Sequence, residues 1–176
     1  MEGSRRSWEN VQLWHQGWHD AHADLVPLGV SPFRTEEHFV IWLREARDAF
    51  YVAADDSDLL GFASIKGVGV VKLYVGKSSR GTGAAHALLS FAEKLLRDNG
   101  VANAELLCTA GNTRAERFYA REGWSLSESF EDVLWLPEGT EKSSWCLPIV
   151  FRRISDRTSR FRARISGRLS KDLDVA

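Results

Sequence analysis

Apolar side chains recur every three or four positions in four stretches of the chain, and this spacing predicts four helices. In the first of them, Trp14 and Trp18 belong to the apolar stripe and are expected mostly in the core. The expected helices are 8–23, 35–48, 83–99 and 112–121. Short runs rich in β-branched and aromatic residues, bounded by turn residues, predict strands. The expected strands are 50–54, 59–65, 70–75, 104–109, 124–130 and 145–154.

The order of these elements predicts how the strands pair. Strands 50–54 and 59–65 are separated by a short acidic turn, which predicts a β-hairpin. Strand 70–75 is followed by helix 83–99 and then by strand 104–109, and such a crossover connects parallel neighbours in a right-handed sense. The expected sheet therefore combines antiparallel hairpins with one parallel pair.

Composition is that of a soluble globular protein. The chain has 176 residues, 44% of them hydrophobic and 27% charged, which favours one domain with a core of its own. A net charge of −1 and the lack of an apolar run of about 18 residues favour neither nucleic acid nor membrane as a partner. The N-terminus has no apolar segment of the signal-peptide type. Cys108 and Cys146 lack metal-ligand spacing, so we expect free thiols, no metal and a cytoplasmic location.

The C-terminal residues differ in charge from the rest. Residues 153–176 hold seven Lys or Arg against three Asp. We therefore divide the chain into a domain at 1–154 and a basic tail at 155–176. In the tail, Phe161 and Ile165 begin an i, i+4 apolar repeat, which fits a marginal amphipathic helix; a disordered, solvated extension is the favoured interpretation. A nucleic-acid-binding role for this tail is an alternative.

The stretch 73–89 reads as a strand, a tight turn and an amphipathic helix. Its turn, Arg80-Gly-Thr-Gly-Ala-Ala, holds small residues that let a ligand approach the backbone. Unpaired N–H groups at the start of a helix, together with the helix dipole, favour an anion such as phosphate. No Lys-Ser/Thr follows the second glycine, so the turn is not a Walker loop, and its glycine spacing is not that of a dinucleotide fingerprint. A purely structural glycine turn is the alternative.

A second motif gives the first a specific meaning. Residues 112–124 have the form Asn-x-x-Ala-x-x-Phe-Tyr-x-x-x-Gly-Trp. In this order and spacing, the two motifs and the strand Leu73-Tyr-Val resemble the GNAT superfamily of acetyl-coenzyme A-dependent N-acetyltransferases. The resemblance covers about residues 35–152.

The resemblance implies both a fold and a binding site. The fold is α/β (α+β), a mixed and mostly antiparallel sheet of six or seven strands with helices on both faces. A V-shaped split separates strand 70–75 from strand 104–109. The turn would hold the coenzyme A diphosphate, the strand before it would pair with the pantetheine amides, and Asn112 would bind the pantetheine arm. The implied coenzyme-binding residues are Leu73, Tyr74, Val75, Arg80, Gly81, Thr82, Gly83, Ala84, Ala85, Asn112 and Tyr119.

The resemblance also implies a reaction in which an amine attacks the thioester directly. The N–H of Val75 would polarise the carbonyl oxygen, and Tyr119 would protonate the leaving thiolate as general acid. The alternatives are a core role for Tyr119 beside Phe118 and a helix-capping role for Asn112.

The proton acceptor is left open by the sequence. Many relatives carry a glutamate on the strand before the turn, and residues 70–75 have none. Lys72 would need strong desolvation to act as a base. The histidines of the first two helices and a water relay are alternatives. These histidines are His15, His19, His22 and His38.

The expected activity is transfer of acetyl to a primary amine, with a small molecule as the favoured acceptor. The alternatives are a protein or peptide acceptor, at an N-terminus or a lysine, and a regulatory acyl-coenzyme A-binding module without turnover. The sequence is compatible with a homodimer and does not determine the oligomeric state. The chain departs from the family in two places: residues 1–6 make a poor first edge strand, and Lys77 stands where a proline is usual.

Overall fold

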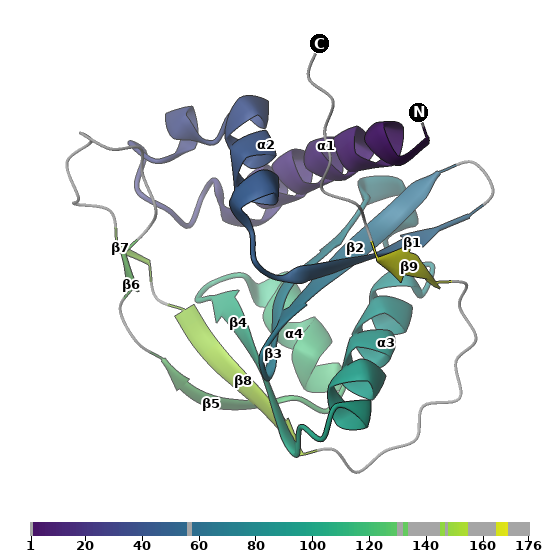
Figure 1. The fold of residues 1–176 in the computed structure, drawn as a ribbon. Coiled ribbons are helices and arrows are strands. Elements are labelled where there is room, and N and C mark those ends of the chain that lie inside the picture. Colours follow the sequence, from purple (N-terminus) through teal and green to yellow (C-terminus); the bar gives the residue numbers. More distant parts are fainter. Residues whose placement is uncertain are drawn as a thin grey trace.

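A computed structural model of the protein describes residues 2–55 and 58–129, together with the short segments 132–133, 145–146, 148–154 and 165–168. Side chains are described for residues 7–55 and 58–129. The described chain forms one large sheet with helices on both of its faces (Figure 1). No helix among these residues is both long and apolar enough to cross a bilayer.

Seven strands form the large sheet, in the order β5-β8-β4-β3-β2-β1-β9. Among the described strands, β3 and β4 are the parallel pair, and every other neighbouring pair is antiparallel. The expected α/β fold with a mixed sheet of six or seven strands is therefore confirmed. The strands are β1 (Ala49–Ala54), β2 (Leu59–Lys66), β3 (Gly69–Val75), β4 (Asn103–Thr109), β5 (Ser125–Ser129), β8 (Pro148–Ile154) and β9 (Ile165–Arg168).

The helices divide between the two faces. The helices α1 (Glu2–His22) and α2 (Glu36–Glu45) cover one face, and α3 (Ala84–Asp98) packs on the other with α4 (Thr113–Arg121) beside it (Figure 1). Two short 3-10 turns, η1 (Ser31–Phe33) and η2 (Lys77–Ser79), lie in the connections. The hydroxyl of Thr35 accepts the N–H of His38 at 3.4 Å and so caps α2, as its sequence suggests.

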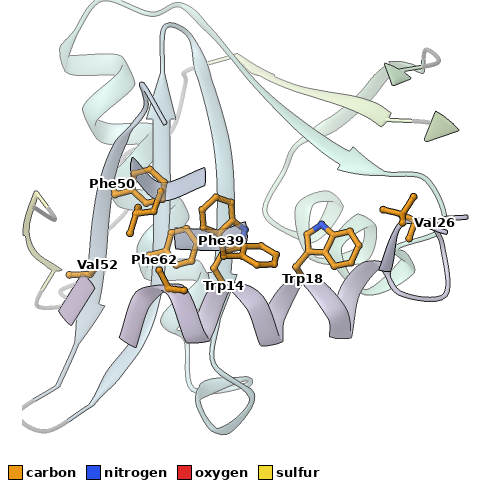
Figure 2. Packing of buried hydrophobic residues seen from close by; sticks show 10 residues of the cluster. Trp14, Trp18, Val26, Phe39, Phe50, Val52 and Phe62 are labelled. Carbon is orange, nitrogen blue, oxygen red and sulfur yellow. The ribbon is translucent and has the colours of Figure 1, made fainter. Parts of the chain in front are cut away.

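Alternation along the strands builds two separate cores. In β1, Phe50 and Val52 point toward α1 and α2, whereas Tyr51 and Ala53 point toward α3. The first core is rich in aromatic rings and is organised around Trp14 (Figure 2). The second core is mostly aliphatic. Its buried residues include Ile65, Val70, Leu89, Leu96 and Leu106.

The parallel pair of strands separates soon after it begins. Cα pairing between β3 and β4 covers only Gly69 with Glu105 and Val70 with Leu106. Beyond these two pairs the strands diverge, although both continue, β3 to Val75 and β4 to Thr109. The expected V-shaped split between these strands is therefore present.

The structure differs from the sequence-based expectation at three places. The helix α1 begins at Glu2, whereas its expected start was residue 8; residues 2–6 are therefore helical, in keeping with the poor edge strand that their sequence predicts. The strand expected at 145–154 is divided into β7 (Trp145–Cys146), which pairs with β6 (Asp132–Val133) in a separate ribbon, and β8. In the tail, 165–168 form strand β9 beside β1, instead of a helix or a solvated extension. The rest of the tail and most of the acidic loop 131–140 lie outside the described residues.

Candidate active site

A cleft of about 590 Å³ opens where β3 and β4 separate. Its walls come from α1, β3, the turn after β3, the first turns of α3, β4 and α4. All the predicted site residues except Thr82 and Ala84 line it. The hydroxyl of Thr82 is turned to the carbonyl oxygen of Ser79, to which it donates at 2.7 Å, and Ala84 faces the core with 7% of its surface exposed.

One edge of β3 presents free backbone groups to this cleft. The N–H of Gly76 donates to the carbonyl of Leu60 on β2 at 2.9 Å. In an antiparallel pair every second residue bonds to the neighbouring strand, so the backbone groups of Tyr74, two residues before Gly76, also point toward β2. The N–H and C=O groups of its neighbours Leu73 and Val75 therefore point to the opposite side, where β4 has already diverged. Such an edge can pair with an extended chain of amides, as an added strand would.

The turn before α3 is shaped by two glycines. Gly81 and Gly83 have φ angles of 80° and 92°, in the left-handed region that residues with a Cβ rarely adopt. Gly83 caps α3 without a side-chain hydrogen bond. Within the described residues, the N–H groups of Gly83, Ala84 and Ala85 have no backbone acceptor. With the positive end of the helix dipole, they make an anion site at one end of the cleft.

Arg80 joins this turn to the first helix. Its Nη2 donates to Oδ2 of Asp20 on α1 at 2.7 Å. This hydrogen bond is the main reason that the pKa of Asp20 lies below its usual value, with the charges of Arg80, Lys77 and Arg114 adding to it. The guanidinium of Arg80, which lies in the turn that forms the anion site, is thus held by the carboxylate of Asp20 on α1.

Asn112 combines the two roles that its sequence context suggested as alternatives. Its Oδ1 accepts the N–H of Ala115 at 3.2 Å, which caps α4. The side chain also lines the cleft. Because the cap uses only Oδ1, the two N–H bonds of Nδ2 remain for a ligand.

Tyr119 projects from α4 into the cleft wall and is 8% exposed. Burial raises the pKa of its phenol, and the nearby Cys108 and Tyr74 act in the same direction. Cys108 lies on β4 in the same wall, and burial raises the pKa of its thiol to about 12. Both groups therefore keep their protons at neutral pH.

Gly17 and Ala21 of α1 also line the cleft, and neither was among the residues predicted for the site. A Cβ on Gly17 would lie 2.7 Å from Cδ1 of Tyr74, so the glycine lets α1 approach β3 closely. The signal that could have identified Gly17 is a glycine inside a helical repeat. Glycine destabilises a helix, and its presence there usually reflects a close contact that a larger side chain would block. Two further cleft residues, His86 of α3 and Glu122 after α4, pair at 2.6 Å through Nδ1 and Oε2.

The four histidines considered as bases lie in different surroundings, and His22 is the one that lines the cleft. His15 is 3.8 Å from Glu36, and His19 forms a hydrogen bond to the carbonyl of Arg34 at 2.8 Å. His38 is buried, and burial with the charge of Arg34 lowers its pKa to about 4. Within the described residues, three or more His, Cys, Asp or Glu side chains nowhere gather as a metal site would require.

The comparisons with known proteins agree with this architecture. The model of the acetyltransferase (GNAT) family matches residues 11–124, which span both motifs and the split. N-acetyltransferases of Mycobacterium bovis and Mycobacterium tuberculosis, described as uncharacterised, are 32% identical to the chain over 123 residues. The match covers 60% of this chain and 79% of each relative.

Solved structures share the fold at low sequence identity. A GCN5-related N-acetyltransferase from Rhodopseudomonas palustris superposes with a TM-score of 0.67 at 17% identity, over 85% of this chain and 90% of that one. The PaiA N-acetyltransferase from Thermoplasma acidophilum, determined in complex with coenzyme A, gives 0.56 at 17% identity, over 82% and 92%. A ribosomal-protein-alanine N-acetyltransferase from Brucella melitensis gives 0.59 at 16% identity, over 82% and 91%. These likenesses show the fold.

Proposed function

The chain belongs to the acetyltransferase (GNAT) family and is an N-acetyltransferase, and we propose that it moves the acetyl group of acetyl-coenzyme A to the primary amine of a small molecule. One observation carries the proposal: the unpaired edge of β3, the anion site at the start of α3 and Tyr119 share one cleft. Each of these three parts matches a different portion of an acyl thioester of coenzyme A.

The cleft fits the donor from end to end. The diphosphate would sit on the N–H groups of Gly83, Ala84 and Ala85. The pantetheine amides would pair with the free N–H and C=O of Leu73 and the C=O of Val75, as a strand adds to a sheet edge, and the N–H of Val75 is left for the acetyl group. Nδ2 of Asn112 would then bind the middle of the arm. The donor is held mainly by the backbone, which explains why glycines and small residues dominate the turn.

The acetyl carbonyl would lie at the end of β3, where the N–H of Val75 points into the split. That N–H donates to the carbonyl oxygen and stabilises the negative charge that develops there when the amine attacks. The bond from carbon to sulfur then breaks, and Tyr119 gives its hydroxyl proton to the departing thiolate. Burial raises the pKa of the Tyr119 phenol, so its hydroxyl keeps its proton at neutral pH until the thiolate forms.

Substitution of Tyr119 by Phe tests the role of the hydroxyl. We expect kcat to fall by about 100-fold or more, within the range that general acid catalysis contributes, while the Kd for coenzyme A changes little. Thiol release from acetyl-coenzyme A with a panel of primary amines measures the first quantity, and titration calorimetry measures the second. Tyr51→Phe is the matched control, because Tyr51 packs on Phe91 outside the cleft. A wild-type rate in Tyr119→Phe would show that the assignment is wrong.

The amine panel also tests the acceptor class. Turnover with small amines and none with peptides supports the proposal, whereas turnover only with peptides or proteins replaces the acceptor with a polypeptide. Binding of acetyl-coenzyme A without thiol release in either panel would support a regulatory binding module.

A further inference from the structure

A primary alkylamine reaches the active site as an ammonium, because its pKa lies near that of lysine, about 10.4. It must lose a proton before its nitrogen can attack, and β3 offers no acceptor. Lys72, the ionisable residue of β3 besides Tyr74, has its ammonium paired with Asp48 at 2.7 Å. Among the described residues that line the cleft, Glu122 is the one that carries a carboxylate. Its Oε2 already pairs with Nδ1 of His86 at 2.6 Å.

His22 stands at the end of α1 and lines the cleft, together with Gly17 and Ala21 of the same helix. Its ring stacks on Trp18, with centroids 5.3 Å apart and planes at 25°, and its centroid is 6.5 Å from that of Tyr74. Its Nδ1 is 3.0 Å from the carbonyl oxygen of Trp18. A carbonyl can only accept, so the N–H is on Nδ1 and the lone pair is on Nε2.

The surroundings of His22 favour the neutral ring. Burial lowers the pKa of His22, and the cations of Arg114 on α4 and Arg34 after η1 lower it further, against the hydrogen bond to Trp18, which raises it. From β3, the group that faces it is the phenol of Tyr74, whose raised pKa keeps it uncharged. At neutral pH the imidazole is therefore unprotonated and able to take a proton.

Building on the proposed function, we propose that His22 is a catalytic residue, the base that accepts the proton of the acceptor ammonium at Nε2. The ammonium nitrogen transfers one proton to Nε2, and its freed lone pair forms the bond to the acetyl carbon. As the carbon–sulfur bond breaks, Tyr119 protonates the sulfur, and the second nitrogen proton restores the Tyr119 hydroxyl. The imidazolium then releases its proton to solvent, so the net products are amide, thiol and one proton.

The test compares two acceptors that differ in charge and little in shape. One is the best alkylamine of the panel, which is an ammonium at pH 7; the other is its aminooxy analogue, in which oxygen replaces the carbon next to nitrogen and the nitrogen is neutral. In His22→Asn we expect kcat/KM for the alkylamine to fall by about 100-fold or more. For the aminooxy analogue we expect a change of less than about five-fold, since no proton has to be removed before attack.

Two controls separate proton transfer from structural damage. His15→Asn removes a histidine of the same helix that does not line the cleft, and both acceptors should react at the wild-type rate. The Kd of His22→Asn for coenzyme A should equal that of the wild type. If the asparagine variant does not fold, His22→Gln is measured, together with the pH profile of the wild type. The profile for the alkylamine should lose activity on the acid side with the midpoint at which His22 titrates by NMR.

Equal losses for the two acceptors would overturn the assignment and make His22 a positioning residue. Undiminished alkylamine turnover in His22→Asn would also overturn it, in favour of a water relay. These results are distinguishable from failure of the proposed function, in which the wild type itself acetylates no amine.

Discussion

The two faces of the sheet are packed with different side chains. Under α1 and α2, rings surround Trp14: the centroids of Phe39, Trp42 and Phe62 lie 5.1 to 5.9 Å from that of Trp14. Under α3 and α4, the core is mostly aliphatic. The anion site is carried by the aliphatic face, and the helix that supplies His22 is carried by the aromatic face.

Buried charge follows the same division. The aromatic face encloses Arg34, whose guanidinium lies 5.3 Å from the ring of Trp18 and 4.8 Å from that of Trp42. It is 1% exposed, and burial lowers its pKa to about 10. The aliphatic face buries Glu93, whose Oε1 accepts a hydrogen bond from Nε1 of Trp124 at 2.8 Å. Stability of the first face therefore depends on rings and protonation, and that of the second mainly on apolar area.

The largest expected effect is that of removing the central ring of the aromatic face. Trp14 is 2% exposed, and its loss would leave a cavity among five other rings. We expect Trp14→Ala to lower the free energy of unfolding by about 3–5 kcal/mol, measured by urea denaturation.

Trp8→Ala is the matched control, because Trp8 lies on the same helix and is 43% exposed. Its cost should stay below about 1 kcal/mol, as for most exposed sites. Equal costs for the two substitutions would break the comparison, because the aromatic face would then have no central residue.

Acidification should weaken the aromatic face next. The pKa of His38 in the folded protein is about 4, below the ordinary value of 6.5, because the side chain is buried and lies near Arg34. As the pH falls from 6.5 toward 4, the unfolded chain takes up a proton that the folded chain does not. The free energy of unfolding should therefore decrease over this window, by about 1–3 kcal/mol from His38.

Unfolding by urea at pH 7, 6 and 5, followed by tryptophan fluorescence, measures this loss. His38→Gln removes the titrating group and should flatten the dependence, leaving the smaller part that His22 contributes in the same direction. An unchanged slope in His38→Gln would assign the acid sensitivity to other groups.

The smallest effect concerns the ion pair that connects the two regions, Asp20 on α1 with Arg80 in the turn. Partly exposed pairs contribute about 0.2–1 kcal/mol, so Asp20→Asn should barely change stability. The substitution also removes a negative charge from the anion site and frees Arg80. We expect coenzyme A to bind up to about five-fold more tightly, measured by calorimetry at low salt. Weaker binding would instead mean that Asp20 holds Arg80 in its binding orientation.

The donor half of the site is the part that the sequence predicted best. Gly81 and Gly83 fall in a turn between a strand and a helix, and Asn112 caps the helix that carries Tyr119, seven positions further along. These relations are local, so the residues that share a task also share a short stretch of sequence. Their predicted roles in binding and catalysis remain predictions.

Other features depend on contacts between distant segments. The pairing of β9 with β1 joins residues more than a hundred positions apart, and the apolar repeat of the tail suggested a helix there. Gly17 matters because Tyr74 lies against it, and Arg34 is buried because two tryptophans from different helices enclose it. No local pattern encodes these neighbours.

The sequence by itself determined the order of the elements, the mixed sheet, the family resemblance and the short motifs expected to hold the donor. Hydrophobic period, turn residues and helix caps act within a few residues, which is why they can be read along the chain. The tertiary structure decided which of four histidines meets the cleft, which carboxylate holds Arg80 and which strand covers the edge of the sheet. Those outcomes depend on how α1 packs on β3 and on which backbone edges remain unpaired, and both are properties of the folded chain as a whole.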